Sequence, residues 1–113
     1  MTIRYCFALD LKDNPKLIEE YRLYHKNVWP EVVQSFRDAG IESLEIYLLG
    51  TRMFMILEGN EHFSLVSKAS ADLANPKIQE WEALMWGFQQ ALPQAGPGEK
   101  WLVMEQIYHF HQG

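Results

Sequence analysis

Three segments of the chain alternate apolar and polar positions with a period of two, which is typical of β-strands in a half-buried sheet. They are residues 3–11 (IRYCFALDL), 41–49 (IESLEIYLL) and 52–58 (RMFMILE). The dipeptide GT at 50–51 predicts a tight turn, so the last two segments form a hairpin. A long fourth strand is predicted over 100–110 (KWLVMEQIYHF), after a proline- and glycine-rich loop.

Helical periodicity fills the spaces between these strands. It runs over 15–39, more weakly over 63–74, and again over 75–92. The two strongest helices open alike, with Asn-Pro-Lys at 14–16 and 75–77, where asparagine can cap and proline occupies the first helical position. Gly40 is a natural terminator of the first helix.

The order strand, helix, strand, strand, helix, strand predicts an α+β fold, the ferredoxin-like βαββαβ sandwich, as a single domain over 1–113. Such a sheet carries helices on one face only. Its other face still has apolar positions, and an exposed apolar face of this size favours association. We therefore expect a homodimer with two-fold symmetry, in which two sheets close face to face into a dimeric α+β barrel and the last strand reaches the partner.

Composition narrows the range of partners. Acidic residues outnumber basic ones 15 to 10, which argues against nucleic acid or an anionic membrane surface as a partner. The single cysteine, Cys6, can build neither a disulfide framework nor a cysteine zinc site, and this usage fits a reducing cytoplasm. No signal peptide and no membrane-spanning run of 18 apolar residues is expected.

The stretch YRLYHKNVWPE, residues 21–31, combines aromatic residues, a histidine and a proline. Tyr21, His25 and Trp29 are spaced by four, so they would share one helical face. Pro30 removes a helical hydrogen bond and should make the helix kink or restart there. A bend at the end of this stripe would form an aromatic recess around one imidazole. The alternative is plain packing, because aromatic residues and half-exposed histidines are common on helices that cover a sheet.

A second cluster, QEWEALMW, supports the functional interpretation. It places Trp81 and Met85 on one helical face with Glu82 beside them. An indole, a carboxylate, an imidazole and a phenol together suit a sugar: the ring's apolar face lies on the indole while polar groups hold the hydroxyls. Tyr47 could offer another hydroxyl. By itself, the Trp81–Met85 stripe would fit a protein core better than a binding site.

Motifs of other chemistries are absent from the sequence. It contains no GxGxxG, Walker loop, HExxH or GxSxG. His109 and His111 lie two apart, and without a third ligand they make a metal site improbable. No metal and no cofactor is expected.

The stretch EEYRLYHKNVWPEV resembles the Tyr-x-x-x-His-x-x-x-Trp-Pro-Glu signature of the L-rhamnose mutarotase family. The resemblance continues through EIYLLGTRMFMILE, NPKIQEWEALM and EKWLVMEQIYHF, and so covers nearly the whole chain. It implies dimeric α+β barrels of ferredoxin-like subunits that work without metal or cofactor. It also implies a sugar site containing Tyr21 and His25, with His25 as the acid–base group and Trp81 as the stacking residue.

Two positions depart from the pattern of rhamnose-acting members. Glu82 stands where those members commonly have a second tryptophan, and Leu44 where they have a tyrosine. The blocks DLKDNP, LEIY and EWEALMW look closer to members associated with L-fucose. The resemblance therefore favours a mutarotase that interconverts the anomers of a 6-deoxy-L-hexose, L-fucose before L-rhamnose, with Met85 or Leu44 beside the sugar's methyl group.

Two other functions remain alternatives. One is a small dimeric-barrel oxygenase or haem-degrading enzyme, in which His25 would bind haem or act as a base toward a phenol. The other is a non-catalytic sugar-binding dimer. Haem titration or oxygen uptake would identify the first alternative, and sugar binding without faster anomer exchange would identify the second.

Overall fold

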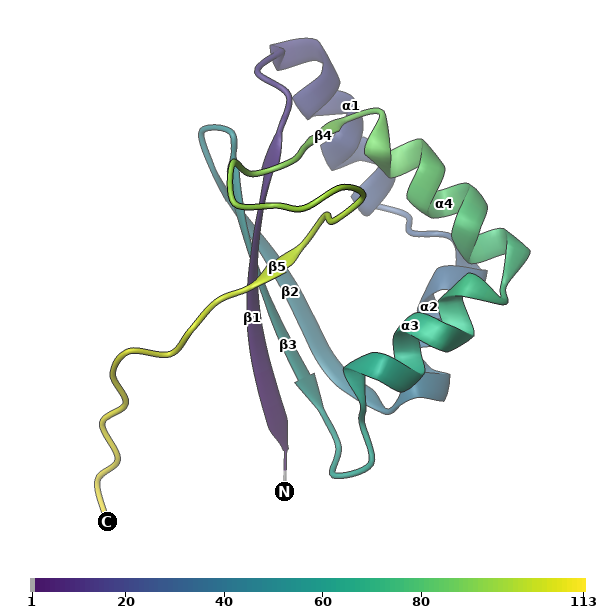
Figure 1. Cartoon of the computed structure of the whole chain (residues 1–113). Coiled ribbons are helices and arrows are strands. Elements are labelled where there is room, and N and C mark those ends of the chain that lie inside the picture. Colours follow the sequence, from purple (N-terminus) through teal and green to yellow (C-terminus); the bar gives the residue numbers. More distant parts are fainter. Residues whose placement is uncertain (1) are drawn as a thin grey trace.

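The computed structural model describes residues 2–113 and consists of one antiparallel sheet with helices on one of its faces (Figure 1). The strands are β1 (Ile3–Leu11), β2 (Ile41–Leu49), β3 (Arg52–Gly59), β4 (Gln89–Gln90) and β5 (Leu102–Val103). The helices are α1 (Pro15–His25), α2 (Pro30–Ala39), α3 (Leu65–Leu73) and α4 (Pro76–Trp86).

The sheet has the order β2-β3-β1-β4, and β5 also pairs with β1. In the pairing of β1 with β3, Phe7 lies opposite Met55. In the β2–β3 hairpin, Ile46 lies opposite the same Met55. On the other edge of β1, β4 pairs at Leu11 and β5 pairs at Phe7. The fourth strand of the ferredoxin-like pattern is thus split into two short pieces by the loop 91–101, which folds back toward α4 (Figure 1).

The core lies between the sheet and the helices. Odd-numbered residues of β1 and β3 point into it, among them Leu9 and Met53, which are almost fully buried. Asn14 caps α1 and Asn75 caps α4, each accepting hydrogen bonds from two backbone N–H groups of the first turn. The predicted Asn-Pro helix openings are confirmed at both positions.

The predicted interruption of the first helix at Pro30 is also confirmed. Helix α1 ends at His25, and α2 begins at Pro30 as its first residue. Trp29 precedes the proline with ψ of 137°, an extended conformation that relieves the clash with the proline ring. The second segment ends at Gly40, whose φ of 86° is left-handed.

Two predicted boundaries are wrong. The helix expected to reach Leu92 ends at Trp86. The backbone after Gly87 instead forms hydrogen bonds near the end of β1, where the Lys12 N–H donates to the Phe88 carbonyl at 2.9 Å. The long strand expected over 100–110 is only Leu102–Val103. Beyond Met104 the chain leaves the sheet and lies exposed, since strand pairing at an edge is weak without side-chain packing.

The sheet face opposite the helices is bare in the single chain. Tyr47 and Leu49 are exposed on it, and Phe54 and Ile56 are only partly buried. Within residues 2–113, no helix has the length and apolar character needed to cross a membrane.

Candidate active site

A cavity of about 270 Å³ lies between the inner face of the sheet and the helices. Five of the predicted site residues line it together: Tyr21, His25, Trp81, Glu82 and Met85. Its floor is apolar, with Ile46 and Met55 from the sheet, so the few polar groups that reach the cavity stand out. This is the layout of a small-molecule pocket, a mostly apolar space with a small number of convergent polar groups.

Helix α1 presents Tyr21 and His25 from successive turns. The imidazole Nδ1 lies 2.8 Å from the Tyr21 backbone oxygen. A carbonyl oxygen only accepts hydrogen bonds, so Nδ1 carries a hydrogen, and in the neutral ring it is the only nitrogen that does. Nε2 is then left with its lone pair, and His25 is set up as a proton acceptor.

The surroundings of His25 keep it neutral. Its ring centroid is 4.4 Å from the Tyr21 ring and 5.7 Å from the Trp81 indole. Burial among these groups lowers the pKa of His25 below its ordinary value of 6.5, and the Tyr21 carbonyl only partly opposes the shift. At neutral pH the imidazole is therefore a free base.

The Tyr21 hydroxyl sits at the same end of the cavity. It accepts a hydrogen bond of 3.1 Å from Gln89 Nε2, on β4. Burial raises the pKa of Tyr21 above 10.0, so the phenol stays protonated. Because its oxygen is the acceptor toward Gln89, its own hydrogen remains available for a ligand.

Helix α4 supplies the opposite wall. Trp81 and Met85 are buried one turn apart, and Glu82 follows Trp81 into the lining. The Glu82 carboxylate has one long protein contact, 3.5 Å from Gln79 Nε2, which leaves most of its acceptor capacity free.

Two predicted site residues lie elsewhere. Trp29 does not line the cavity; its ring packs against the Trp81 indole, with the two centroids 5.2 Å apart in an edge contact. Tyr47 lies on the bare face of the sheet, 53% exposed, with its hydroxyl donating to Glu45. Side chains alternate along a strand, so position 47 points away from the helices when Ile46 points toward them.

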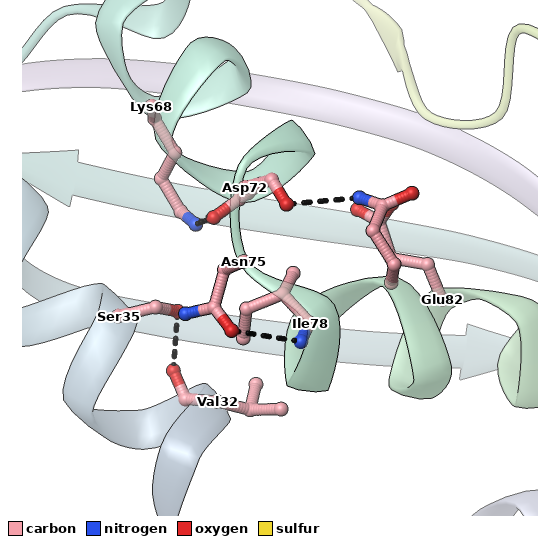
Figure 2. A network of polar contacts seen from close by, with 8 residues as sticks. Val32, Ser35, Lys68, Asp72, Asn75, Ile78 and Glu82 are labelled. Atoms are coloured by element: carbon pink, nitrogen blue, oxygen red, sulfur yellow. Dashed lines mark hydrogen bonds and ion pairs between the residues drawn. The ribbon is translucent and has the colours of Figure 1, made fainter.

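An ion pair forms another polar part of the lining. Lys68 and Asp72, one turn apart on α3, approach to 2.7 Å, and their side chains are only 16% and 17% exposed. Figure 2 shows them beside the start of α4, where Asn75 caps the helix at Ile78. The Lys68 ammonium also lies over the Phe36 ring at 5.4 Å.

The loop between β4 and β5 brings in Lys100 and Trp101. The Lys100 ammonium donates to the Glu82 backbone oxygen at 3.0 Å and lies over the Trp86 ring at 5.2 Å. Burial lowers the pKa of Lys100, and the negative charge of Glu82 partly restores it. The loop is thereby fastened to α4 across the cavity.

Five polar lining residues were not predicted from the sequence: Ser35, Lys68, Asp72, Gln89 and Lys100. For Gln89 a signal existed, since it stands four positions after the buried Met85 and so interrupts an apolar stripe. A Lys-Asp pair at i, i+4 usually marks a solvent-facing helix, and a lysine in a loop usually marks the surface. Their inward orientation depends on tertiary packing.

Among residues 2–113, no group of three or more histidine, cysteine, aspartate or glutamate side chains is placed to hold a metal ion. His109 and His111 stack at 6.0 Å in the exposed tail.

The fold and the cavity define a ferredoxin-like α+β protein with a small, mostly apolar pocket in which a few polar groups surround a neutral histidine. A sequence model described as L-rhamnose mutarotase matches residues 4–110. The chain therefore belongs to the L-rhamnose mutarotase family.

Individual relatives agree with this assignment. The chain is 47% identical to an L-fucose mutarotase of Xanthomonas campestris pv. campestris over 93% of its length and 86% of that protein. It is 35% identical to an L-rhamnose mutarotase of Sinorhizobium fredii over 73% and 75% of the two chains. The crystal structure of an L-rhamnose mutarotase from Formosa agariphila superposes with a TM-score of 0.70 at 19% identity, covering 96% of this chain and 99% of that one.

These comparisons confirm the family resemblance and the predicted ferredoxin-like fold. They also confirm, at the level of the family, that the chain is an isomerase of the mutarotase class.

Proposed function

We propose that this protein interconverts the α and β anomers of a 6-deoxy-L-hexose in the cavity around His25, and that it prefers L-fucose to L-rhamnose. The family supports the reaction, and the relative named L-fucose mutarotase supports the preferred sugar. The observation that carries the proposal is the neutral imidazole of His25, held by a backbone carbonyl among aromatic rings inside a cavity.

His25 is the group that moves the proton. Its Nε2 takes the proton from the anomeric hydroxyl; the electron pair forms the C1=O double bond as the bond from C1 to the ring oxygen breaks. The ring oxygen leaves as an alkoxide and takes the proton back from the imidazolium. Both oxygens are attached to C1, so one imidazole can serve both. Rotation about C1–C2 and the reverse steps close the ring on the other face.

The other lining residues hold the sugar. The Trp81 indole offers a surface for the apolar C–H face of the pyranose, and Tyr21 donates a hydrogen bond from a phenol that burial keeps protonated. Glu82 accepts from a hydroxyl. Met85 and Leu44 provide the apolar contact that a 6-deoxy sugar needs for its methyl group.

Anomer exchange measured by saturation-transfer NMR tests this function directly. L-Fucose, L-rhamnose and D-galactose are compared with and without protein, at equal buffer concentration, because buffers also catalyse mutarotation. The expected order of enzymatic rates is L-fucose, then L-rhamnose, with D-galactose slowest because it has the opposite configuration at every stereocentre of L-fucose and also carries a C6 hydroxyl that would be buried against apolar groups. Exchange at the buffer rate for both 6-deoxy sugars would refute the proposal.

We further propose that the protein acts as a homodimer, closed through the bare face of the sheet. Tyr47 and Leu49 on that face, and Ile107 and Phe110 in the tail, are apolar groups that a single chain leaves exposed. A second copy, related by a two-fold axis, would bury both. Sedimentation equilibrium gives the mass directly, and a monomer at micromolar concentration would contradict this part of the proposal. The single free cysteine is compatible with a reducing compartment such as the cytoplasm.

A further inference from the structure

The amide of Gln89 is only half used by the protein. The side chain is 5% exposed and lines the cavity from β4. Its Nε2 donates to the Tyr21 hydroxyl at 3.1 Å. Its Oε1 is the buried side-chain polar atom that finds no hydrogen-bond partner anywhere in residues 2–113.

A buried acceptor without a partner destabilises a folded protein, and most native structures avoid it. A leucine would fit this buried position without that penalty. The Gln89 Nε2 group gives one reason for a glutamine at this position, because its hydrogen bond holds the Tyr21 hydroxyl in place. The hydrogen bond to Tyr21 does not explain why the Gln89 Oε1 atom is buried without a partner. Both atoms belong to one planar amide group, which lines the same cavity as His25.

We infer that Gln89 is a sugar-binding residue whose Oε1 accepts a hydrogen bond from one hydroxyl of the bound monosaccharide. This inference rests on the proposed function and assigns a hydroxyl-recognising group to the same site. Gln89 then acts twice: Nε2 orients the Tyr21 phenol, and Oε1 meets the ligand. Around Tyr21 the cavity then offers a sugar one donor and one acceptor side by side, a pairing suited to two neighbouring hydroxyls.

The test compares Gln89→Leu with Gln90→Leu. Gln90 is the exposed neighbour on β4 and does not line the cavity. Binding of L-fucose is followed by tryptophan fluorescence and, independently, by ligand line broadening in NMR. Loss of one neutral hydrogen bond corresponds to roughly tenfold weaker binding. We expect that loss in Gln89→Leu and unchanged binding in Gln90→Leu, with both variants folded by circular dichroism.

A double-mutant cycle separates direct contact from action through Tyr21. In a Tyr21→Phe background, Gln89 has no phenol oxygen to orient. If Gln89 touches the sugar, Gln89→Leu weakens binding in this background too, again by roughly tenfold. If the substitution weakens binding only when Tyr21 is present, Gln89 is a positioning residue and the inference is overturned. Unchanged binding in Gln89→Leu would overturn it as well.

Singly deoxygenated L-fucose analogues identify the hydroxyl. One analogue should bind the wild-type protein less tightly than L-fucose yet bind Gln89→Leu as tightly as L-fucose does, because the shared hydrogen bond is already gone. If every analogue loses the same factor in both proteins, no hydroxyl contacts Gln89.

The two proposals fail in different ways. Wild-type protein that binds L-fucose without accelerating anomer exchange would refute the mutarotase proposal while leaving the Gln89 contact measurable. Wild-type protein that binds no 6-deoxy sugar would refute both.

Discussion

Replacing His25 by alanine should remove most of the catalysis and little of the stability. Positioned proton transfer is worth about 10²–10⁴ in rate, or about 3–5 kcal/mol of transition-state stabilisation. The variant loses the 2.8 Å hydrogen bond to the Tyr21 carbonyl and the ring contact with Trp81, but the helix itself continues to be capped by Asn14. The expected loss in kcat/KM for L-fucose is therefore at least a hundredfold.

The matched control is His62→Ala. His62 lies in the loop after β3, with its side chain 84% exposed, and should give wild-type exchange rates. Both variants are assayed by saturation-transfer NMR after subtraction of the buffer rate, with the folded fraction taken from urea unfolding. If His25→Ala retains more than about a third of the wild-type kcat/KM while remaining folded, the assignment of His25 as the proton-transfer group is refuted.

The same histidine fixes the sign of the pH dependence. The active form is the free base, and burial lowers the pKa of His25, so the proton is lost at a lower pH than in an exposed histidine. As the pH falls from 8, the rate should therefore decline with a midpoint below the ordinary histidine value of 6.5. A decline centred above pH 6.5 would contradict the neutral-base mechanism.

Three further predictions concern stability, measured by urea unfolding. Asp72→Asn should cost roughly 2 kcal/mol, because it leaves the largely buried Lys68 ammonium unpaired, whereas Lys68→Met combined with Asp72→Leu should cost less; the reverse order would contradict this. Gly40→Ala should cost about 1–2 kcal/mol, since Gly40 has φ of 86° and its new Cβ would lie 2.7 Å from the Asn60 side chain; an unchanged midpoint would show that the loop adapts. Asn75→Ala should cost about 1 kcal/mol through loss of the α4 cap, and no loss would mean that solvent replaces it.

Local signals in the sequence were sufficient for most of the fold. Asn14 and Asn75, each followed by proline, specify helix starts by backbone chemistry alone, and alternation specifies the first three strands. The length of the last strand was mispredicted. Alternating apolar residues show that a segment can bury one of its faces, but the single chain has no surface against which residues 104–110 pack.

Helical spacing was sufficient to predict which site residues on the same helix lie together. Tyr21 and His25, four apart on α1, meet as expected, as do Trp81 and Met85 on α4. Tyr47 lies outside the cavity of the single chain, on the face of β2 opposite Ile46, and which face of β2 meets the helices depends on tertiary packing that the residues of β2 alone do not fix. Gln89 enters the cavity through a strand pairing between residues 78 positions apart, Leu11 and Gln89, which no local pattern encodes.

The residues that line the cavity come from positions 21 to 101, so the site draws on residues far apart in the sequence and on several helices and strands. No fragment of the chain carries a complete set of these groups. Anomer exchange would therefore report on the integrity of the entire tertiary structure, and any opening that separates α4 from α1 would abolish turnover well before the helices themselves unwind.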